Sequence, residues 1–325
     1  MTEPRTATTY WVEAPGCGAL RRQPLRAPAA GEVELRTTHS GISCGTERLV
    51  GRGRVPTASA AVMACVGMQG SFALPVSYGY CLVGTVVGTG ARVFTMHPHH
   101  DRAVVAAAQL VPLPPAVPSP RATLLPNLET ALNAVWDAEL RGDESVVVVG
   151  GGAVGLLLTF VLACRHDRAV TLVETDPARR EFAQQLPWRP HVVPPTAVPV
   201  EAAAVAFHTS ATGSGLQLAL DAVGFEGRVV ELSWYGDEPV SLRLGTGFHH
   251  GRKRIVASQV GTIAPSHRAA GRAARTAAVL DLLADARLDT LLAPPIAFAD
   301  LPAFCARLYR GEPTEPCPVV EYPAR

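Results

Sequence analysis

Length, composition and charge exclude several classes of protein. The chain has 325 residues, 48% of them hydrophobic and 18% charged, and its formal net charge is +1. Such a composition is typical of a compact globular protein and not of a disordered chain. The balanced charge gives no reason to expect binding to nucleic acid or to an anionic membrane. A single core rarely grows to this length, so we expect two domains.

The sequence also favours one compartment. Its first residues carry no basic and then apolar leader segment. The longest apolar run, Val154–Cys164, is shorter than the roughly 20 residues that cross a bilayer. The cysteines are scattered, with no C-x-x-C pair, which favours free thiols in a reducing environment. We therefore expect a cytosolic protein that has no membrane partner.

Residues 6–117 are predicted to be rich in β-strands. Valine, leucine and threonine recur between glycine and proline in three runs, Gly31–Thr38, Gly79–Gly88 and Ala103–Leu110. The proline-rich segment 111–120 follows and is a natural domain border.

Beyond this border, helices and strands are predicted to alternate. The expected helices are 122–140, 155–164, 177–186 and 216–223, and the expected strands are 146–149, 169–173, 205–207 and 228–234. Alternation of this kind indicates βαβ units and a parallel, doubly wound sheet of the α/β class.

From about residue 255 this alternation ends. A strand at 255–258, a helix at 268–286 and a helix at 301–309 are expected to return to the N-terminal half. We therefore predict a β-rich domain of residues 1–117, completed by 255–325, and a dinucleotide-binding domain of residues 118–254. Arg268, Arg272 and Arg275 are expected on an exposed helix face.

A glycine turn directly follows the strand 146–149 and opens an apolar helix. In this G-x-G-x-x-G context, glycine lets the backbone approach a pyrophosphate at the positive end of the helix. The predicted cofactor-binding residues are Gly150, Gly152, Ala153, Val154 and Gly155. A purely structural role, packing a helix on a strand, is the alternative.

An acidic residue, Glu174, ends the next strand 19 positions after Gly155. A carboxylate there can accept hydrogen bonds from the adenosine ribose and repels a 2′-phosphate, so NAD is the expected cofactor. NADP stays an alternative because Arg179 and Arg180 lie close by in the sequence and could pair with a phosphate.

Two further motifs carry a resemblance to a known family. Residues 40–47, S-G-I-S-C-G-T-E, resemble the G-I-C-G-T-D segment of the medium-chain dehydrogenase/reductase superfamily, and residues 75–84 resemble its P-x-x-x-G-H-E-x-x-G segment. The resemblance covers essentially the whole chain. It implies a GroES-like catalytic domain beside a Rossmann domain, and a homodimer in which cofactor domains pair edge to edge.

Within that superfamily, the chain is similar to a zinc-independent branch. Its G-Y in place of G-H is similar to bacteriochlorophyllide dehydrogenase-like proteins. It is also similar to dehydrogenase-like proteins that are encoded beside pterin-synthase-like proteins. The shared segments are 93–99, 127–137, 207–211, 231–236 and 258–261.

The resemblance also implies zinc sites, which this chain does not match. The four closely spaced cysteines of a structural zinc are missing, and the metal-binding His and its Glu are replaced by Tyr80 and Cys81. Tyrosine is protonated at neutral pH and is a poor zinc ligand. We expect no zinc. A residual site made by Cys44, Glu129 and one of the histidines 97, 99 or 100 is the alternative.

Without zinc, the reacting oxygen needs hydrogen-bond donors. Tyr80 is the first candidate, and the resemblance implies Thr46 as a proton-relay hydroxyl. Glu129 is a candidate general base or substrate anchor. His208 follows a strand at the carboxyl edge of the sheet, where it could contact the nicotinamide ribose or move a proton. Trp234 is expected beside the nicotinamide. Each of these side chains could instead have only a packing or surface role.

These features together predict a zinc-independent NAD(P)-dependent oxidoreductase. The expected reaction moves a hydride between the nicotinamide and a small molecule with a carbonyl or alcohol, or with an activated double bond. A non-catalytic dinucleotide-binding protein and a residual zinc-dependent alcohol dehydrogenase are the alternatives.

Overall fold

Residues 5–166 and 169–323 are described in a computed structural model of the chain, which divides into two compact units. The first unit comprises residues 1–126 and 283–325, and the second comprises residues 127–282. The extreme ends of the predicted first domain, residues 1–4 and 324–325, lie outside the described residues.

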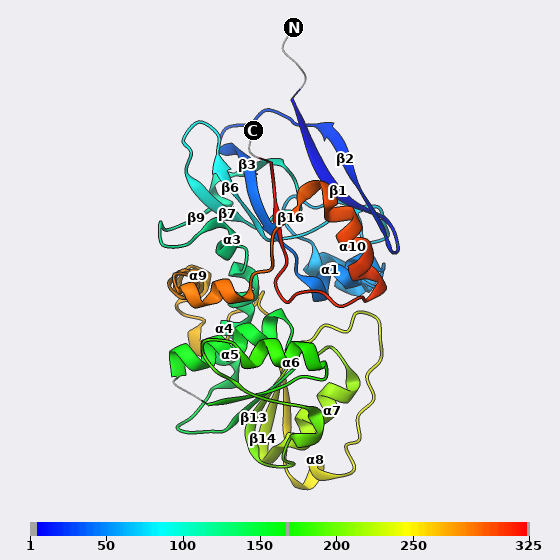
Figure 1. Ribbon diagram of the computed structural model, residues 1–325, viewed down its shortest axis with the longest axis vertical. Coiled ribbons are helices and arrows are strands. Elements are labelled where there is room, and N and C mark those ends of the chain that lie inside the picture. Colours follow the sequence, from blue (N-terminus) through cyan, green and yellow to red (C-terminus); the bar gives the residue numbers. More distant parts are fainter. Residues whose placement is uncertain (1–4, 167–168, 324–325) are drawn as a thin grey trace. The chain divides into compact units, whose positions relative to one another are not determined.

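The second unit is built around a parallel sheet. Its strands run in the order β12-β11-β10-β13-β14-β15. Figure 1 labels two of them, β13 and β14. They are β10 (Val146–Val149), β11 (Val170–Val173), β12 (His191–Val193), β13 (Ala203–His208), β14 (Val223–Glu231) and β15 (Arg254–Ala257). This is the order of a doubly wound dinucleotide-binding sheet, and it confirms the predicted Rossmann fold. Ligands of such sheets bind beyond the carboxyl ends of the strands where the order reverses, here between β10 and β13.

Helices connect these strands and bury their apolar residues. They are α4 (Leu125–Ala138), α5 (Ala153–His166), α6 (Pro177–Gln184), α7 (Gly213–Ala222), α8 (Gly247–His250) and α9 (Gly271–Leu283). Val147 and Val149 of β10 pack in one cluster with Leu216 and Leu220 of α7. Burial of each leucine side chain contributes about 1.5–3 kcal/mol. The cluster fixes α7, and with it the segment that joins β13 to α7.

The first unit is rich in β-strands, as predicted. One sheet has the order β2-β1-β5-β4, and the other has the order β16-β17-β3-β6-β7-β9, with β8 also paired to β3. The strands are β1 (Thr6–Ala14), β2 (Cys17–Pro24), β3 (Glu32–Gly41), β4 (Gln69–Gly70), β5 (Val76–Ser77), β6 (Leu82–Val86), β7 (Arg92–Thr95), β8 (Arg102–Ala106), β9 (Val111–Pro112), β16 (Ile296–Ala297) and β17 (Val319–Glu321). The helices are α1 (Cys44–Gly51), α2 (Ala60–Met63), α3 (Ser119–Ala122) and α10 (Leu301–Arg310).

The C-terminal segment completes the first unit. β17 pairs antiparallel with β3, where Val319 lies opposite Gly41. Leu301 and Leu308 of α10 share a buried cluster with Val12 of β1. The predicted return of the chain to its N-terminal half therefore holds for residues 283–325.

The structure corrects two of the predicted boundaries. Residues 254–257 do not leave the dinucleotide domain, because β15 pairs in parallel with β14, and the second unit extends to residue 282. The predicted helix 122–140 is confirmed as α4 but begins three residues later, at Leu125, because Ala122 is the last residue of the short helix α3. Pro126 lies in the first turn of α4, where its missing N–H costs no intrahelical hydrogen bond.

Candidate functional site

The glycine turn joins β10 to α5 and depends on close contacts. Gly150 has φ +112°, which residues with a Cβ rarely adopt, and its N–H donates to the Val173 carbonyl at 2.9 Å. A Cβ at Gly155 would overlap the Gly150 carbonyl oxygen. By contrast, a Cβ built at Gly152 would meet no heavy atom of the described residues within 4 Å, its own local backbone and chain neighbours aside. The turn therefore leaves open space at Gly152.

That space lies at the N-terminus of α5. Ala153 and Val154 are the first residues of this helix, so their N–H groups have no intrahelical acceptor. A helix N-terminus with free N–H groups favours an anion. The residues of the turn therefore fit a pyrophosphate, and its binding there stays a prediction.

Glu174 lies beside the turn, just after β11. Its Oε2 accepts a hydrogen bond from the Gly151 N–H at 2.8 Å, and its Oε1 accepts from the Asp176 N–H at 2.9 Å and the Thr175 hydroxyl at 3.1 Å. The residue is buried. A carboxylate oxygen has two lone pairs, so Oε2 keeps one for a ribose hydroxyl. The contacts fix the carboxylate next to the turn, on the β11 side.

The two arginines of α6 differ in position. The Arg180 guanidinium donates to the carbonyl oxygens of Glu174 at 3.0 Å and Thr175 at 2.7 Å, so it lies against the end of β11. The Arg179 backbone N–H donates to the carboxylate of Asp176, the N-cap of α6, and its side chain is half-buried. Arg180 is therefore the arginine that the structure brings to the end of β11.

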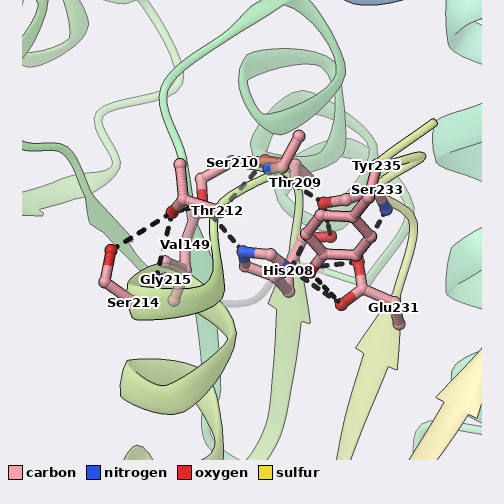
Figure 2. A network of polar contacts seen from close by, with 11 residues as sticks. Val149, His208, Thr209, Ser210, Thr212, Ser214, Gly215, Glu231, Ser233 and Tyr235 are labelled. Atoms are coloured by element: carbon pink, nitrogen blue, oxygen red, sulfur yellow. Dashed lines mark hydrogen bonds and ion pairs between the residues drawn. The ribbon is translucent and has the colours of Figure 1, made fainter. Parts of the chain in front are cut away.

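His208 ends β13 and is the centre of a polar cluster (Figure 2). Its Nδ1 lies 2.8 Å from a carboxylate oxygen of Glu231, and its Nε2 lies 2.7 Å from the Ser210 hydroxyl. The Ser233 N–H and the Tyr235 hydroxyl also donate to Glu231, at 2.7 Å and 3.0 Å. His208 is fully buried. The carboxylate therefore holds the imidazole in one orientation at the edge of the sheet where ligands bind.

Sequence reasoning identified His208 but missed Ser210 and Glu231. The available signal was that His208 follows the predicted strand 205–207 and Glu231 lies in the predicted strand 228–234. In the structure each residue ends its strand, and the register of β13 and β14 pairs them directly. Trp234 follows this cluster and is half-buried, whereas Tyr235 stacks on His208 with ring centroids 6.3 Å apart. The structure thus brings Tyr235 to His208, and the nicotinamide contact of Trp234 stays a prediction.

Glu129 contacts α9. Its carboxylate accepts a hydrogen bond from the Thr276 hydroxyl at 2.6 Å and lies 3.4 Å from the guanidinium of Arg275, a buried side chain. Arg275 also donates to the Asn133 side chain and to the Val260 carbonyl. Losing this carboxylate would leave a buried cation without its ion-pair partner, which is costly. These contacts favour a structural role for Glu129.

Tyr80 and Thr46 come together in the first unit. The side chains of Ser43 and Thr46 lie within hydrogen-bonding reach of the Tyr80 hydroxyl. Ser43 is the N-cap of α1 and Thr46 lies in its first turn. Burial raises the pKa of Tyr80 above its ordinary value, although these hydroxyls oppose the shift. Tyr80 is therefore a neutral hydrogen-bond donor at neutral pH.

A second polar line lies deeper in the first unit. Glu47 of α1 is 3.0 Å from Nε2 of His99, whose Nδ1 is 2.7 Å from the Ser40 hydroxyl. The Ser40 hydroxyl is in turn 3.0 Å from the Tyr322 hydroxyl. These side chains are buried. Sequence reasoning missed this pair because Glu47 and His99 are 52 residues apart and meet only in the folded sheet.

The donor set for zinc is poor in the described residues. There, no three His, Cys, Asp or Glu side chains converge. Burial raises the pKa of the Cys81 thiol well above its ordinary value, which disfavours the thiolate that zinc needs. His100 bonds to the Ser77 hydroxyl at 3.1 Å, and His97 lies 3.1 Å from the Pro98 carbonyl oxygen. The described side chains therefore do not fit a zinc ion.

The chain has a mainly antiparallel β-rich unit and a doubly wound unit, and solved dehydrogenases share this fold. The chain is similar over nearly its whole length to 2R,3R-butanediol dehydrogenase from Bacillus subtilis. They are 17% identical with a TM-score of 0.77, and the alignment covers 98% of this chain and 100% of that chain.

Two other solved structures have the same fold, and each contains a bound cofactor. A short chain alcohol dehydrogenase from E. coli CFT073, complexed with NADH, is 17% identical with a TM-score of 0.76, over 97% of this chain and 99% of that chain. Acetophenone reductase from Geotrichum candidum, in complex with NAD, is 16% identical with a TM-score of 0.76, over 99% and 98%. At these identities the likeness establishes the fold. No family model matches the sequence.

One further finding concerns the helices. Within the described residues, none is both long and apolar enough to span a membrane.

Proposed function

We propose that this protein is an NAD(P)-dependent oxidoreductase that acts without zinc. It moves a hydride between the nicotinamide and a carbonyl or alcohol of a small molecule. An activated double bond is the second kind of reacting group. The observation that carries the proposal is the open glycine turn at Gly152 beside the fixed carboxylate of Glu174. The cofactors bound to structures of the same fold, NADH and NAD, support it.

The cofactor site is assigned to the second unit. The N–H groups of Ala153 and Val154 bind the pyrophosphate, and Oε2 of Glu174 accepts a hydrogen bond from the adenosine ribose. NAD is the proposed cofactor, because the buried carboxylate repels a 2′-phosphate. Arg180, at the end of β11, is the residue that would lessen this preference. The bound dinucleotide supplies or accepts the hydride.

The proton chemistry is assigned to the first unit. Tyr80 donates a hydrogen bond to the substrate oxygen as negative charge develops on it. The hydroxyls of Ser43 and Thr46 orient the phenol. The proton that the product alcohol gains passes from the Tyr80 hydroxyl to the substrate oxygen. A solvent proton then replaces it, relayed through the Thr46 hydroxyl, which gives one proton and takes up another. Because Tyr80 is neutral at neutral pH, it does this work without a metal ion.

Two readings compete with this proposal. The first is a protein that binds a dinucleotide without catalysing a reaction. One observation favours it: the candidate base Glu129 pairs with Arg275 and bonds to the Thr276 hydroxyl, contacts that serve the structure of the second unit. A residual zinc enzyme requires ligands that the described side chains do not assemble.

Calorimetry with NADH and NADPH, combined with metal analysis of the purified protein, tests the proposal. We expect NADH to bind more tightly than NADPH, and the protein to contain far less than one zinc per chain. Turnover is screened with acetophenone, benzaldehyde and butanedione, which resemble compounds named for enzymes of this fold. Failure to bind either dinucleotide would reject the proposal.

We also propose a cytosolic homodimer that forms through β15. This strand lies at the edge of the sheet, and its Ile255 side chain is 38% exposed. An exposed edge strand is a template for pairing with a second copy. Light scattering on the eluting protein measures the mass, and a monomer at micromolar concentration would contradict this proposal.

A further inference from the structure

His99 lies in the first unit, in the segment that joins β7 to β8. Its side chain is only 1% exposed. Its carbonyl oxygen accepts a hydrogen bond from the Tyr10 N–H of β1 at 2.9 Å, which fixes the backbone at this position. The proposed reaction gives this residue no part, although both of its ring nitrogens are bonded. A buried imidazole with two polar partners has a fixed orientation.

The two ring nitrogens of His99 have different partners. Nε2 lies 3.0 Å from Oε2 of Glu47, and Nδ1 lies 2.7 Å from the Ser40 hydroxyl. Glu47 is in the first turn of α1, where the free N–H groups of the helix favour an ionised carboxylate. Such a carboxylate only accepts hydrogen bonds, so Nε2 donates to Glu47 whether the ring is neutral or charged.

Glu47 connects His99 to the start of α1. Its Oε1 accepts a hydrogen bond from the Ser43 N–H at 2.8 Å, and its own N–H donates to the Ser43 carbonyl at 2.9 Å. These two bonds fix Ser43, whose hydroxyl lies within hydrogen-bonding reach of the Tyr80 hydroxyl. A change at His99 therefore reaches the phenol through two intervening residues.

The imidazole also lies against the backbone that carries Tyr80. Gly79, the residue before it, has φ +137°, and a Cβ built there would lie only 3.0 Å from Cδ2 and Nε2 of His99. This close approach requires glycine. The Cys65 thiol donates to the Gly79 carbonyl at 3.0 Å. The same ring therefore restrains both the backbone before Tyr80 and one hydroxyl partner of its phenol.

Ser40 and Tyr322 lie on the opposite side of the ring from Glu47. The Ser40 hydroxyl, on β3, is 3.0 Å from the Tyr322 hydroxyl, and Tyr322 directly follows β17. This half of the line joins β3 to the C-terminal segment. It therefore offers a control that disturbs the same buried line without changing the contact between His99 and Glu47.

We propose that His99 is a positioning residue for proton donation by Tyr80. It holds Glu47, and through it Ser43, in the arrangement that orients the phenol toward the substrate oxygen. His99 itself does not contact the reacting atoms, and no proton passes through it. The inference rests on the proposed function, because it assigns His99 to the reaction proposed at Tyr80.

Two amide substitutions separate the two nitrogens of His99. In His99→Gln the amide nitrogen can take the place of Nε2 and donate to Glu47, whereas in His99→Asn it can take only the place of Nδ1. Both lose the ring, so urea unfolding should show similar losses of stability. We expect His99→Asn to lower kcat about tenfold, as for one lost hydrogen bond, and His99→Gln to stay within about threefold of the unaltered protein. The affinity for NADH should not change.

The Tyr80→Phe protein distinguishes positioning from a general loss of structure. Without the phenol hydroxyl, His99 has nothing to orient, so adding His99→Asn should lower kcat no further. A merely structural effect would lower kcat by the same factor with or without that hydroxyl. Tyr322→Phe is the matched control, because it removes the partner of Ser40 and should lower stability without changing kcat.

A spectroscopic measurement reports on Tyr80 without any turnover. The chain has six tyrosines, and NMR of protein with isotope-labelled tyrosine resolves their ring signals. The Tyr80 signal is the one that Tyr80→Phe removes. His99→Asn should shift this signal, and His99→Gln should leave it close to its original position. If His99→Asn does not fold, His99→Met, which is similar in volume and cannot donate to Glu47, replaces it in each comparison.

The outcomes separate this inference from the proposed function. Equal losses of kcat in His99→Asn and His99→Gln, or the same loss without the Tyr80 hydroxyl, would overturn the inference and leave the proposed function standing. An unchanged kcat in His99→Asn would also overturn it. If the unaltered protein transfers no hydride, the proposed function fails, and the NMR comparison alone decides whether His99 positions Tyr80. A Tyr80 signal that does not respond to His99→Asn then overturns the inference as well.

Discussion

Replacing Tyr80 with phenylalanine removes one hydroxyl and keeps the ring that packs edge-on against Tyr78. The proposed chemistry then loses its donor to the developing oxyanion. We expect Tyr80→Phe to lower kcat about 10²- to 10³-fold, as for the loss of one such donor. The affinity for NADH should not change. Steady-state kinetics with the substrate found in the carbonyl screen, and calorimetry with NADH, measure the two effects.

Tyr78→Phe is the control for that substitution. The Tyr78 hydroxyl donates to the Met63 carbonyl at 3.0 Å, so its loss should cost about 1 kcal/mol of stability and leave kcat unchanged. A Tyr80→Phe protein with the kcat of the unaltered protein would remove Tyr80 from the mechanism.

His97 gives a pH-dependent prediction. The side chain is 5% exposed, and burial lowers its pKa to about 4 from the ordinary 6.5. Between these values the unfolded chain binds more protons than the folded one, so stability falls as the pH drops from 6.5 toward 4 and this loss stops below 4. From pH 7 to pH 5, His97 should account for a loss of about 2 kcal/mol.

Urea unfolding at both pH values measures this contribution. His97→Gln keeps a donor for the Pro98 carbonyl and cannot gain the proton, so its free energy of unfolding should fall less on acidification. The other titrating groups are common to both proteins and cancel in the comparison. An identical pH dependence in the two proteins would show that His97 is not the cause.

For single residues, the sequence indicated which side chains to consider better than it indicated their roles. Tyr80 and Thr46 could be singled out because both lie in recognisable motifs, and the structure brings their side chains together. The ion pair of Glu129 could not be foreseen, since Arg275 lies 146 residues away. The expectation that Arg275 is exposed is wrong, because Asn133, Glu129 and a backbone carbonyl hold it in the interior.

At the turn from β10 to α5, effects of a substitution on folding can be separated from effects on cofactor binding. A side chain at Gly152 would project into open space, whereas a side chain at Gly155 would overlap the Gly150 carbonyl. We expect Gly152→Val to fold normally and to lose NADH binding. Gly155→Ala should instead lower the unfolding temperature. Calorimetry and thermal unfolding of both variants check this, and normal NADH affinity of Gly152→Val would refute the pyrophosphate site.

The predicted elements were accurate where the pattern was long or strongly apolar. The buried strand β10 and the helices α5 and α6 were expected at nearly their observed positions. The three-residue strand β12 was not expected, because it is too short to show a period. β15 was placed in the wrong domain, because four residues reveal a strand but not the sheet in which it pairs.

Across the whole molecule, the fold class followed from the order of the elements and from motifs that resemble one superfamily. The structure confirms that fold at identities of only 17% to solved dehydrogenases. The polar clusters at His208 and at Glu47 required coordinates, because each joins residues that are separated in the sequence.

We propose above all that this chain transfers a hydride without zinc. Its most direct test uses NADH deuterated at the transferable position, a carbonyl substrate from the screen, and protein whose metal content has been measured. We predict deuterium in the alcohol product at a rate that does not depend on zinc and survives a chelator. Tight NADH binding with no deuterium transfer to any carbonyl, or a rate lost with the chelator and restored by zinc, would contradict the account.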